Sequence, residues 1–293
     1  MQGTLQEIQK GDKEGEGSEE SRLGLMQEIP TVVITTYNEV KNIDTLIKSL
    51  LSQTMQCHII VVDSESNDGT IDALKKFDTE RVSFKIKKCT RGEGRNLGVE
   101  MSSSRLVLFT DGDAIPDRNW VECMSKCLND ADLVSGETVQ KGIKRYASFK
   151  RVKLFYRNFE ITSPSMNIGI RRDVFIKVGG FDPRFITAED IDLNLRIISM
   201  DYKGIFCNSC KISHIARQDL RSFLKQAFWN GYGRGQLRSK NRTMWAYIKK
   251  GKIDPREIGI YWLLRNLSAV LGYLSFLIFG KKDFNYCPPS EGH

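Results

Sequence analysis

The chain has 293 residues and a net charge of +8, and 40% of its residues are hydrophobic while 27% are charged. These values are typical of a folded soluble protein, so they exclude a polytopic membrane protein and a chain that is disordered throughout. The length is sufficient for one large or two small domains with a sizeable core.

Charge is distributed unevenly along the chain. Residues 1–28 are rich in Gly, Glu and Ser and show no hydrophobic period, so we predict a disordered acidic tail without a signal peptide. Residues 217–256, in contrast, hold eleven Lys and Arg side chains against Asp219 and Asp254. A patch this basic indicates an anionic partner such as phosphates, nucleic acid or an acidic membrane surface.

The first half of the chain alternates apolar strands with amphipathic helices. The β-branched run 31–36 predicts the first strand, and the apolar residues of 43–51 recur at helical spacing. Further strands are expected at 58–63, near 82–86 and at 105–110, and further helices from about residue 70 and over about 94–101. This order predicts an α/β fold whose mostly parallel sheet has helices on both faces and binds ligands beyond the carboxyl ends of its strands.

The second half is less regular, with a strand expected near 165–170 and helices from Arg171 and over 189–200. Residues 258–279 are 22 mostly apolar residues interrupted by Arg265 and Asn266. Such a segment just spans a hydrocarbon core of about 30 Å. Because a central Arg costs a few kcal/mol in a bilayer, an interfacial or re-entrant helix competes with a spanning one, and a buried core helix is a third alternative.

Carboxylate-bearing turns follow three of the predicted strands, at 37–39, 63–69 and 111–113. The carboxyl ends of parallel strands meet at one edge of a sheet, so we expect the three turns to converge. Their mutual repulsion requires a cation or hydrogen-bond donors nearby. In kinases and dehydrogenases, a glycine-rich phosphate-binding loop follows the first strand. The turn 37–39 occupies that position here, so the sequence does not favour either of these two enzyme classes.

Individual acidic residues in these turns and at the start of a later helix could bind a metal ion or a nucleotide, or act as a general base. Asp111 and Asp113 flank a glycine at a strand end and can share one hard divalent cation, although a solvated turn is the alternative. Asp63 can accept hydrogen bonds from a nucleobase or ribose, whereas Asp68 also fits a helix cap. Asp190 begins a predicted helix and can serve as a general base, with plain capping as the alternative.

The seven cysteines are odd in number and nothing marks secretion, so we expect reduced thiols in a cytosolic compartment. Cys207, Cys210 and His214 suggest a zinc site. Only these three ligands are visible, however, and no second cysteine pair has suitable spacing. We therefore expect Cys207 and Cys210 to be ordinary thiols in a strand and turn.

Seven short motifs appear in an order and at spacings that resemble a family-2 inverting glycosyltransferase with the GT-A fold. They are Val33–Glu39, Val61–Ser64, Asn67–Thr70, Arg95-Asn96-x-Gly98, Asp111–Asp113, Arg171-Arg172 with Gly179–Asp182, and Glu189-Asp190. The resemblance covers about Pro30 to Gly235. The signature of processive synthases is matched only loosely, by 226–229, which favours the addition of a single sugar.

This resemblance implies roles for individual residues. Those that would bind the nucleotide sugar are Thr36, Glu39, Asp63, Arg95, Asp111 and Glu189. Asp113 would bind Mg²⁺ or Mn²⁺, and His214 would help to hold the metal or the diphosphate. Asp190 matches the position of the catalytic base.

The chain is accordingly expected to contain a catalytic domain over 29–217, a basic helical acceptor or membrane-proximal region over 218–256, and an apolar membrane-associating helix and tail over 257–293. The implied activity is metal-dependent sugar transfer from a nucleoside-diphosphate sugar to an acceptor, with a polyprenyl phosphate or glycolipid favoured, at the cytoplasmic face of a membrane. No nucleic acid is expected. The alternatives are a sugar-phosphate nucleotidyltransferase and a non-catalytic, membrane-tethered nucleotide-sugar binding module.

Overall fold

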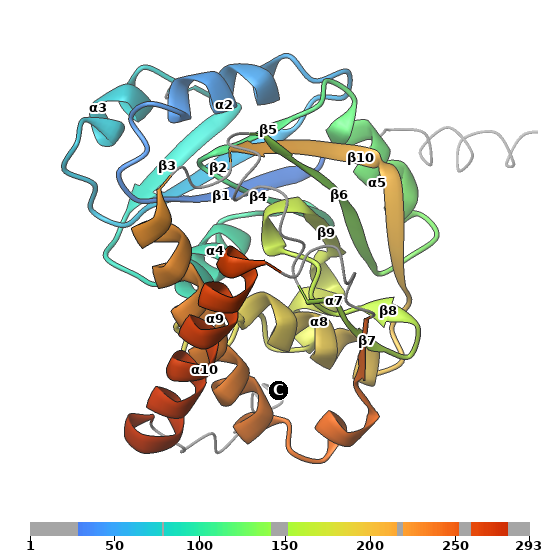
Figure 1. Ribbon diagram of the computed structural model, residues 1–293. Helices are drawn as coiled ribbons and strands as arrows, with labels where there is room; N and C mark the ends of the chain where they lie inside the picture. The colour runs from blue at the N-terminus through green and yellow to red at the C-terminus, as the bar shows by residue number, and fades with distance from the viewer. Residues whose placement is uncertain (1–28, 78, 142–151, 216–218, 252–258, 281–293) are drawn as a thin grey trace, which may run out of the picture.

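The computed structural model describes residues 29–77, 79–141, 152–215, 219–251 and 259–280 (Figure 1). The predicted acidic tail, 1–28, lies outside these ranges. So do residues 217–218 and 252–256 of the basic region expected from the sequence.

An eight-stranded sheet in the order β3-β2-β1-β4-β9-β6-β10-β5 forms the centre of the molecule. Its strands are β1 (Thr31–Thr36), β2 (His58–Asp63), β3 (Val82–Ile86), β4 (Leu106–Asp111), β5 (Ala114–Pro116), β6 (Leu133–Lys141), β9 (Ile168–Arg171) and β10 (Gly204–Ile215). Four of its seven pairings are parallel, while β9 and β5 run antiparallel to their neighbours. The prediction of a mostly parallel sheet flanked by helices is confirmed.

A second, small sheet has the order β11-β7-β8. Its strands are β7 (Leu154–Tyr156), β8 (Phe159–Glu160) and β11 (Lys249–Lys250). The helices are α2 (Ile43–Leu51), α3 (Thr70–Lys75), α4 (Arg91–Glu100), α5 (Trp120–Leu128), α7 (Arg172–Lys177), α8 (Glu189–Ser199), α9 (Leu220–Lys240) and α10 (Ile260–Phe279), with 3₁₀ turns at Ser165–Asn167 and Met244–Tyr247.

Helix α4 begins three residues earlier than the sequence pattern indicated. Thr90 Oγ1 accepts a hydrogen bond from the Glu93 backbone N–H at 3.3 Å, and the Glu93 carboxylate accepts one from the Thr90 N–H at 2.7 Å. This reciprocal capping box satisfies the first backbone donors of the helix and sets its start.

Alternate residues of the central strands point into two separate hydrophobic cores. On one face, Val32 and Ile34 pack with α2, α3 and α5, and on the other Val33 and Phe109 pack with α4, α7 and α8. Because residues of both alternating sets are buried, the strands of the parallel half have continuous apolar sequences. The two-faced packing holds the carboxyl ends of β1, β2 and β4 at one edge of the sheet.

Helices α9 and α10 pack side by side with their backbones in contact (Figure 1). A Cβ atom at Gly231 would overlap the backbone of Ala269, and one at Gly272 would overlap the backbone of Phe228. Small residues permit this close approach, as they do between helices in membranes. The pair is therefore a single unit whose geometry depends on glycine.

Helix α9 is attached to the α/β body by a buried ion cluster. The Lys240 ammonium, 7% exposed, lies 2.7 Å from Asp182 and 2.9 Å from Asp192. Burial disfavours the ionised form of Asp182, but hydrogen bonds from Arg184 and Lys240 hold its pKa below the usual range. The cluster places α9 against the segment that leads into α8, where a Cβ atom at Gly233 would touch Thr187 at 2.7 Å.

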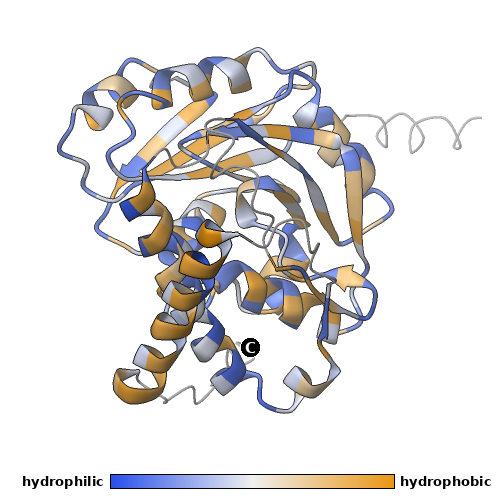
Figure 2. Cartoon of the chain, in the orientation of Figure 1, coloured by the Kyte–Doolittle hydropathy of each residue, from blue (hydrophilic) through white to orange (hydrophobic). Residues whose placement is uncertain are grey.

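Among the described residues, α10 is the helix long and apolar enough to cross a membrane, with a mean hydropathy of 1.5 over its best window. Only 11% of that window is buried within the chain. Large apolar residues such as Leu263, Leu267 and Leu271 are more than half exposed, and Figure 2 shows the helix as a mostly hydrophobic column at the rim of the molecule. A buried core helix, one of the three alternatives, is therefore excluded for this segment.

Candidate active site

The loops that follow β1 and β2 are tied together by hydrogen bonds. The backbone N–H of Asn38 donates to Ser66 Oγ at 2.8 Å, and that of Glu39 donates to Thr70 Oγ1 at 2.9 Å. Asp68 is exposed, and it accepts hydrogen bonds from the N–H groups of Val40 and Thr70, so it links both loops. Two of the three predicted acidic turns therefore form one structural unit.

Asp63 is completely buried at the end of β2. Its carboxylate accepts hydrogen bonds from Thr36 Oγ1 at 2.8 Å, from the Ser66 N–H at 2.8 Å and from Ser66 Oγ at 2.7 Å. These donors offset the cost of burying the charge. Asp63 and Thr36 therefore hold the loop that follows β2 in place.

The third acidic turn packs directly on the first. A Cβ atom at Gly112 would lie 2.8 Å from Glu39 Cγ and 3.2 Å from Thr36 Cγ2, so glycine is needed for this close approach. Burial raises the pKa of the Glu39 carboxyl above its ordinary value, and the carboxylates of Asp113 and Asp111 add to the rise against a hydrogen bond from Asn42. The predicted convergence of the three turns is observed, and it concentrates negative charge at this edge.

Arg95 on α4 joins this edge to α8. Its guanidinium is 1% exposed and donates to Asp111 at 2.7 Å and to Glu189 at 3.0 Å, while it stacks 5.3 Å from the centre of the Phe181 ring. Burial alone would lower the pKa of Arg95, but the two carboxylates hold it above the ordinary value. Arg95 therefore positions two acidic side chains from distant parts of the chain.

Asp190 lies next to this bridge at the first turn of α8. Ala188, which precedes the helix, adopts a left-handed conformation with φ 67°, and the Asp190 carboxylate accepts a hydrogen bond from the Ile191 N–H at 2.8 Å. Burial, together with the neighbouring charge of Glu189, raises the pKa of Asp190 to about 6. A carboxylate with a raised pKa is a stronger base than an ordinary one, and the nearby Arg95 charge keeps part of that rise in check.

Asp113 and His214 meet although 101 residues separate them. The His214 Nε2 atom lies 3.1 Å from Asp113 Oδ2, and its Nδ1 atom lies 3.0 Å from Gln140 Oε1. The antiparallel pairing of β10 with β5 places His214 opposite Ala114 and so produces this contact. Both side chains are partly exposed, at 19% for His214 and 37% for Asp113.

The site residues inferred from the sequence thus lie along one network of contacts. It begins at Thr36 and Asp63, continues through Glu39 and Asp111, and ends at Arg95, Glu189 and Asp190. Asp113 and His214 lie at its side. Sequence reasoning did not find the buried cluster of Asp182, Asp192 and Lys240 behind α8. Asp182 belongs to a quoted motif, but its partner Lys240 is 58 residues away and carried no local signal.

The expectation of reduced thiols is wrong for two cysteines. Cys123 and Cys210 are joined by a disulfide, whereas Cys207 and Cys127 lie beside them as free thiols. The second cysteine pair that the zinc interpretation lacked is on α5, 80 residues or more away in sequence. Its spacing was not recognisable as half of a site because it meets the other pair only through packing of α5 against β10.

Two solved structures have folds similar to that of this chain. A mannosyltransferase from Pyrobaculum calidifontis, solved with GDP-mannose and Mn²⁺, superposes with a TM-score of 0.60 at 18% identity, covering 88% of this chain and 77% of that one. S. aureus TarS, residues 1–349 with UDP, gives a TM-score of 0.53 at 16% identity, covering 74% of this chain and 71% of that one. The fold is therefore that of the GT-A glycosyltransferases.

Sequence comparison places the chain more narrowly. Residues 31–185 match the family described as Glycosyl transferase family 2. The glycosyltransferase AglE of Haloferax volcanii is 30% identical over 226 residues, which are 71% of this chain and 73% of that protein. The glucosyl-dolichyl phosphate glucuronosyltransferase of the same organism is 23% identical, covering 70% and 75%. The chain belongs to glycosyl transferase family 2 and is a glycosyltransferase, which decides against the nucleotidyltransferase alternative.

Proposed function

We propose that this glycosyltransferase moves one sugar, with inversion at the anomeric carbon, from a nucleoside-diphosphate sugar to a lipid-linked acceptor at a membrane surface. The observation that carries the proposal is the Arg95 bridge, which holds Asp111 and Glu189 together and keeps Asp190 beside the acidic edge of the sheet. The nucleotide would lie against the loops after β1 and β2. The reacting end of the donor would then face α8.

A divalent cation fits the residues at this edge. Asp113 and His214 offer an oxygen and a nitrogen donor 3.1 Å apart, and the raised pKa of Glu39 reflects negative charge that a cation would offset. When bound, Mn²⁺ or Mg²⁺ would stabilise the charge that develops on the departing diphosphate. An imidazole ligand favours Mn²⁺, because Mg²⁺ prefers a shell of oxygen atoms.

Asp190 is proposed to act on the acceptor. If the acceptor is a hydroxyl, the Asp190 carboxylate removes its proton as oxygen attacks the anomeric carbon from the side opposite the diphosphate. If the acceptor is a lipid phosphate, the nucleophile is already an anion, and Asp190 positions the sugar or acceptor instead. Its raised pKa suits the first role, since the carboxylate is ionised at neutral pH and still basic.

The lipid-linked acceptor is inferred from two independent features. Helix α10 exposes an apolar face that includes Ile260, Leu267 and Ile278. Two similar proteins act on dolichyl phosphate-linked sugars by name: the glucuronosyltransferase of Haloferax volcanii, and a Methanococcus voltae enzyme 22% identical over 87% of this chain. We propose that α10 associates with the cytoplasmic face of a membrane and that α9 carries the adjoining acceptor region.

The activity is tested by incubating the full-length protein with labelled nucleoside-diphosphate sugars, Mn²⁺ and vesicles that contain a polyprenyl phosphate. We expect release of the nucleoside diphosphate and labelled lipid, both lost in Asp113→Asn and retained in the control Asp72→Asn, an exposed carboxylate on α3. Binding of a nucleotide sugar without release, for every acceptor tested, would instead support a non-catalytic binding module.

Membrane association is tested separately by vesicle flotation. The triple variant Leu263→Gln, Leu267→Gln, Leu271→Gln removes exposed apolar surface from α10 without touching its packing against α9. We expect it to leave the vesicle fraction. A control with two exposed apolar residues outside the helix pair, Ile176→Gln and Met200→Gln, should still float. Equal flotation of both variants would contradict the membrane role of α10.

A further inference from the structure

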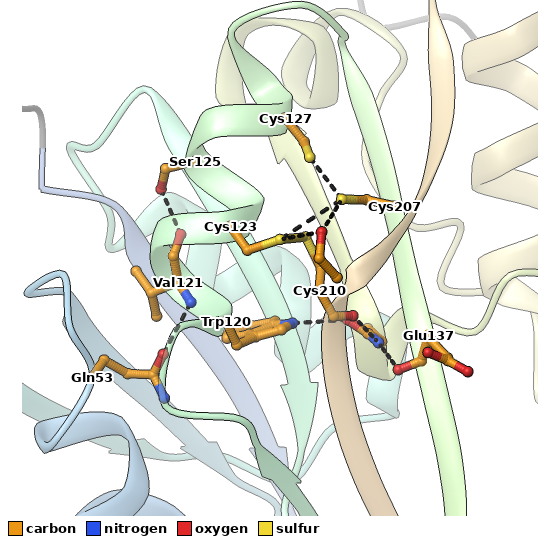
Figure 3. The surroundings of a disulfide bond; sticks show 11 residues. Gln53, Trp120, Val121, Cys123, Ser125, Cys127, Glu137, Cys207 and Cys210 are labelled. Atoms are coloured by element: carbon orange, nitrogen blue, oxygen red, sulfur yellow. Dashed lines mark hydrogen bonds between the residues drawn. A yellow bond between two sulfur atoms is a disulfide. The ribbon is translucent and has the colours of Figure 1, made fainter.

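Four of the seven cysteines meet beside the sheet, away from the acidic edge. Their sulfur atoms all lie within 4.8 Å of one another, and the residues are Cys123, Cys127, Cys207 and Cys210. Figure 3 shows two of them on α5 facing two on β10. We refer to these residues as the four-cysteine cluster.

Each pair is presented by a regular local structure. Cys123 and Cys127 are four residues apart on α5, so they occupy the same face of the helix one turn apart. Cys207 and Cys210 lie in β10 where its register with β6 shifts between Cys207 and Lys211. The bulge gives this strand a local bend, and both of its cysteines face α5 as a result.

The sulfur atoms are close enough together to share one ion. Cys207 Sγ is 3.7 Å from Cys123 Sγ and 2.8 Å from Cys127 Sγ, and Cys123 is joined to Cys210. Zinc–sulfur bonds of about 2.3 Å place tetrahedral ligand sulfurs about 3.8 Å apart. The first distance is close to this value, whereas the disulfide must be reduced and Cys127 Sγ must move away from Cys207 Sγ before all four sulfurs can bind one ion.

A hydroxyl group lies next to one of the sulfur atoms. Ser209 Oγ is 3.3 Å from Cys207 Sγ and can donate a hydrogen bond to it. A donor beside a ligand sulfur offsets part of the negative charge that thiolate ligands bring to a metal. The spacings, Cys-x₃-Cys and Cys-x₂-Cys, lie within those of structural zinc sites.

We propose that the reduced chain binds one Zn²⁺ through the four thiolates of this cluster. All four coordination positions are then filled by the protein, so the role is structural and not catalytic. Thiolate ligands in a tetrahedral array select zinc over hard cations such as Mg²⁺, which keeps this site distinct from Asp113 and His214. The proposal does not depend on the proposed reaction.

The disulfide and the zinc site are two forms of the same cluster. Two equivalents of a low-molecular-weight thiol reduce the Cys123–Cys210 bond, together supply two electrons and two protons, and are joined to each other in a new disulfide. Zinc then binds as the four thiols release four protons. Three of the four cysteines are partly exposed, which gives the reductant and the ion access.

The cluster is connected to the proposed active site through two segments. Helix α5 follows β5, which begins directly after Asp113, and β10 continues from Cys210 to His214. Zinc would therefore fix the spacing of the two segments that bring Asp113 and His214 together. Its loss should lower the melting temperature of the protein.

Metal content and thiol count test the proposal on the full-length protein purified with a thiol reductant and without chelator. We expect about one zinc per chain by mass spectrometry and seven free thiols after denaturation. The variants Cys127→Ser and Cys207→Ser should lose the zinc, and the control Cys89→Ser, outside the cluster, should retain it. Absence of zinc from the wild-type chain, or stoichiometric iron in its place, would overturn the assignment.

A second measurement uses the wild-type chain alone, because a cysteine variant could fail to fold. Anaerobic titration of the reduced, metal-free protein with Co²⁺ should reach saturation at one equivalent, with the intense visible bands of tetrahedral thiolate coordination, and Zn²⁺ should displace the cobalt. Weak octahedral bands, or no binding by the folded reduced chain, would contradict a four-thiolate site.

Discussion

The two halves of the main sheet place their polar groups in different ways. In the half formed by β1 to β4, Asp63 is satisfied by Ser66, three residues away, and by Thr36, 27 residues away. The other half is formed by β9, β6, β10 and β5, together with α8 and α9. Its contacts join residues that are much farther apart in the sequence. Arg95 and Glu189 are 94 residues apart, and His214 and Asp113 are 101 residues apart. The proposed nucleotide end is thus organised by contacts over shorter sequence separations than the proposed reacting end, which distant partners assemble.

This difference predicts unequal sensitivity to substitution. Removing one neutral donor from a local loop leaves other donors in place, whereas removing one member of a buried ion pair leaves its partner charged and unpaired. The reacting end should therefore tolerate substitution less than the nucleotide end.

The largest effect is expected at Asp190. If the acceptor is a hydroxyl, Asp190→Asn should lower the rate about 100- to 10,000-fold, the usual contribution of a general base. Because the base must be ionised, the wild-type rate should rise with pH around a midpoint near its pKa of about 6 and level off above it.

Initial rates between pH 4.5 and 8 measure this profile, with Asp201→Asn as a control at an exposed carboxylate. An unchanged rate and profile in Asp190→Asn would show that the residue is not a base and would favour a phosphate acceptor.

Arg95→Leu should be the most destabilising change at the reacting end. It leaves the carboxylates of Asp111 and Glu189 without their cation, and breaking a buried ion pair in this way costs about 3–5 kcal/mol of unfolding free energy. Urea denaturation measures the loss. Lys48→Leu, which breaks an exposed pair on α2, is the matched control and should have little effect.

Asp113→Asn should leave the fold intact and lower metal-dependent turnover by at least about 100-fold, because a bound cation contributes several kcal/mol to stabilising the leaving diphosphate. Rates measured over a Mn²⁺ titration, together with circular dichroism, separate the two effects. Full activity at every Mn²⁺ concentration would remove Asp113 from the metal site.

Ser66→Ala tests the half of the sheet formed by β1 to β4 and should have the smallest effect on the free energy of unfolding. It removes two hydrogen bonds of Ser66 Oγ, the one donated to Asp63 and the one accepted from the Asn38 N–H. Thr36 Oγ1 and the Ser66 N–H still donate to Asp63, so the cost should be about 2 kcal/mol. Thermal unfolding and the KM for the nucleotide sugar report it. A loss as large as that of Arg95→Leu would contradict the distinction between a local and a long-range half.

Much of the parallel half was predictable from the sequence, because its signals are local. Each signal is contained in a segment of fewer than about a dozen residues. Examples are the β-branched run of β1, the helical period of α2 and the glycine between Asp111 and Asp113. Strands that pair in parallel align their carboxyl ends, so the convergence of the acidic turns followed from the order of elements. The start of α4 differed only because a side-chain cap at Thr90 extends the helix.

The other half could not be derived in the same way. A role for His214 beside Asp113 was expected only through a resemblance, and Cys123 and Cys127 were not considered as partners of Cys207 and Cys210. Both contacts have one cause: the antiparallel entry of β9 and β5 and the bulge in β10 decide which distant residues meet. The period of two along a strand assigns each residue to a face of the sheet, but it does not determine which distant strand lies beside it.

The sequence by itself determined the α/β class, the family resemblance and the acidic turns, since hydrophobic period and turn chemistry act over short distances. Tertiary structure decided which carboxylates Arg95 joins, that His214 meets Asp113, that α10 is exposed and that four cysteines lie together. Those contacts depend on how helices and strands pack, and packing is a property of the whole chain.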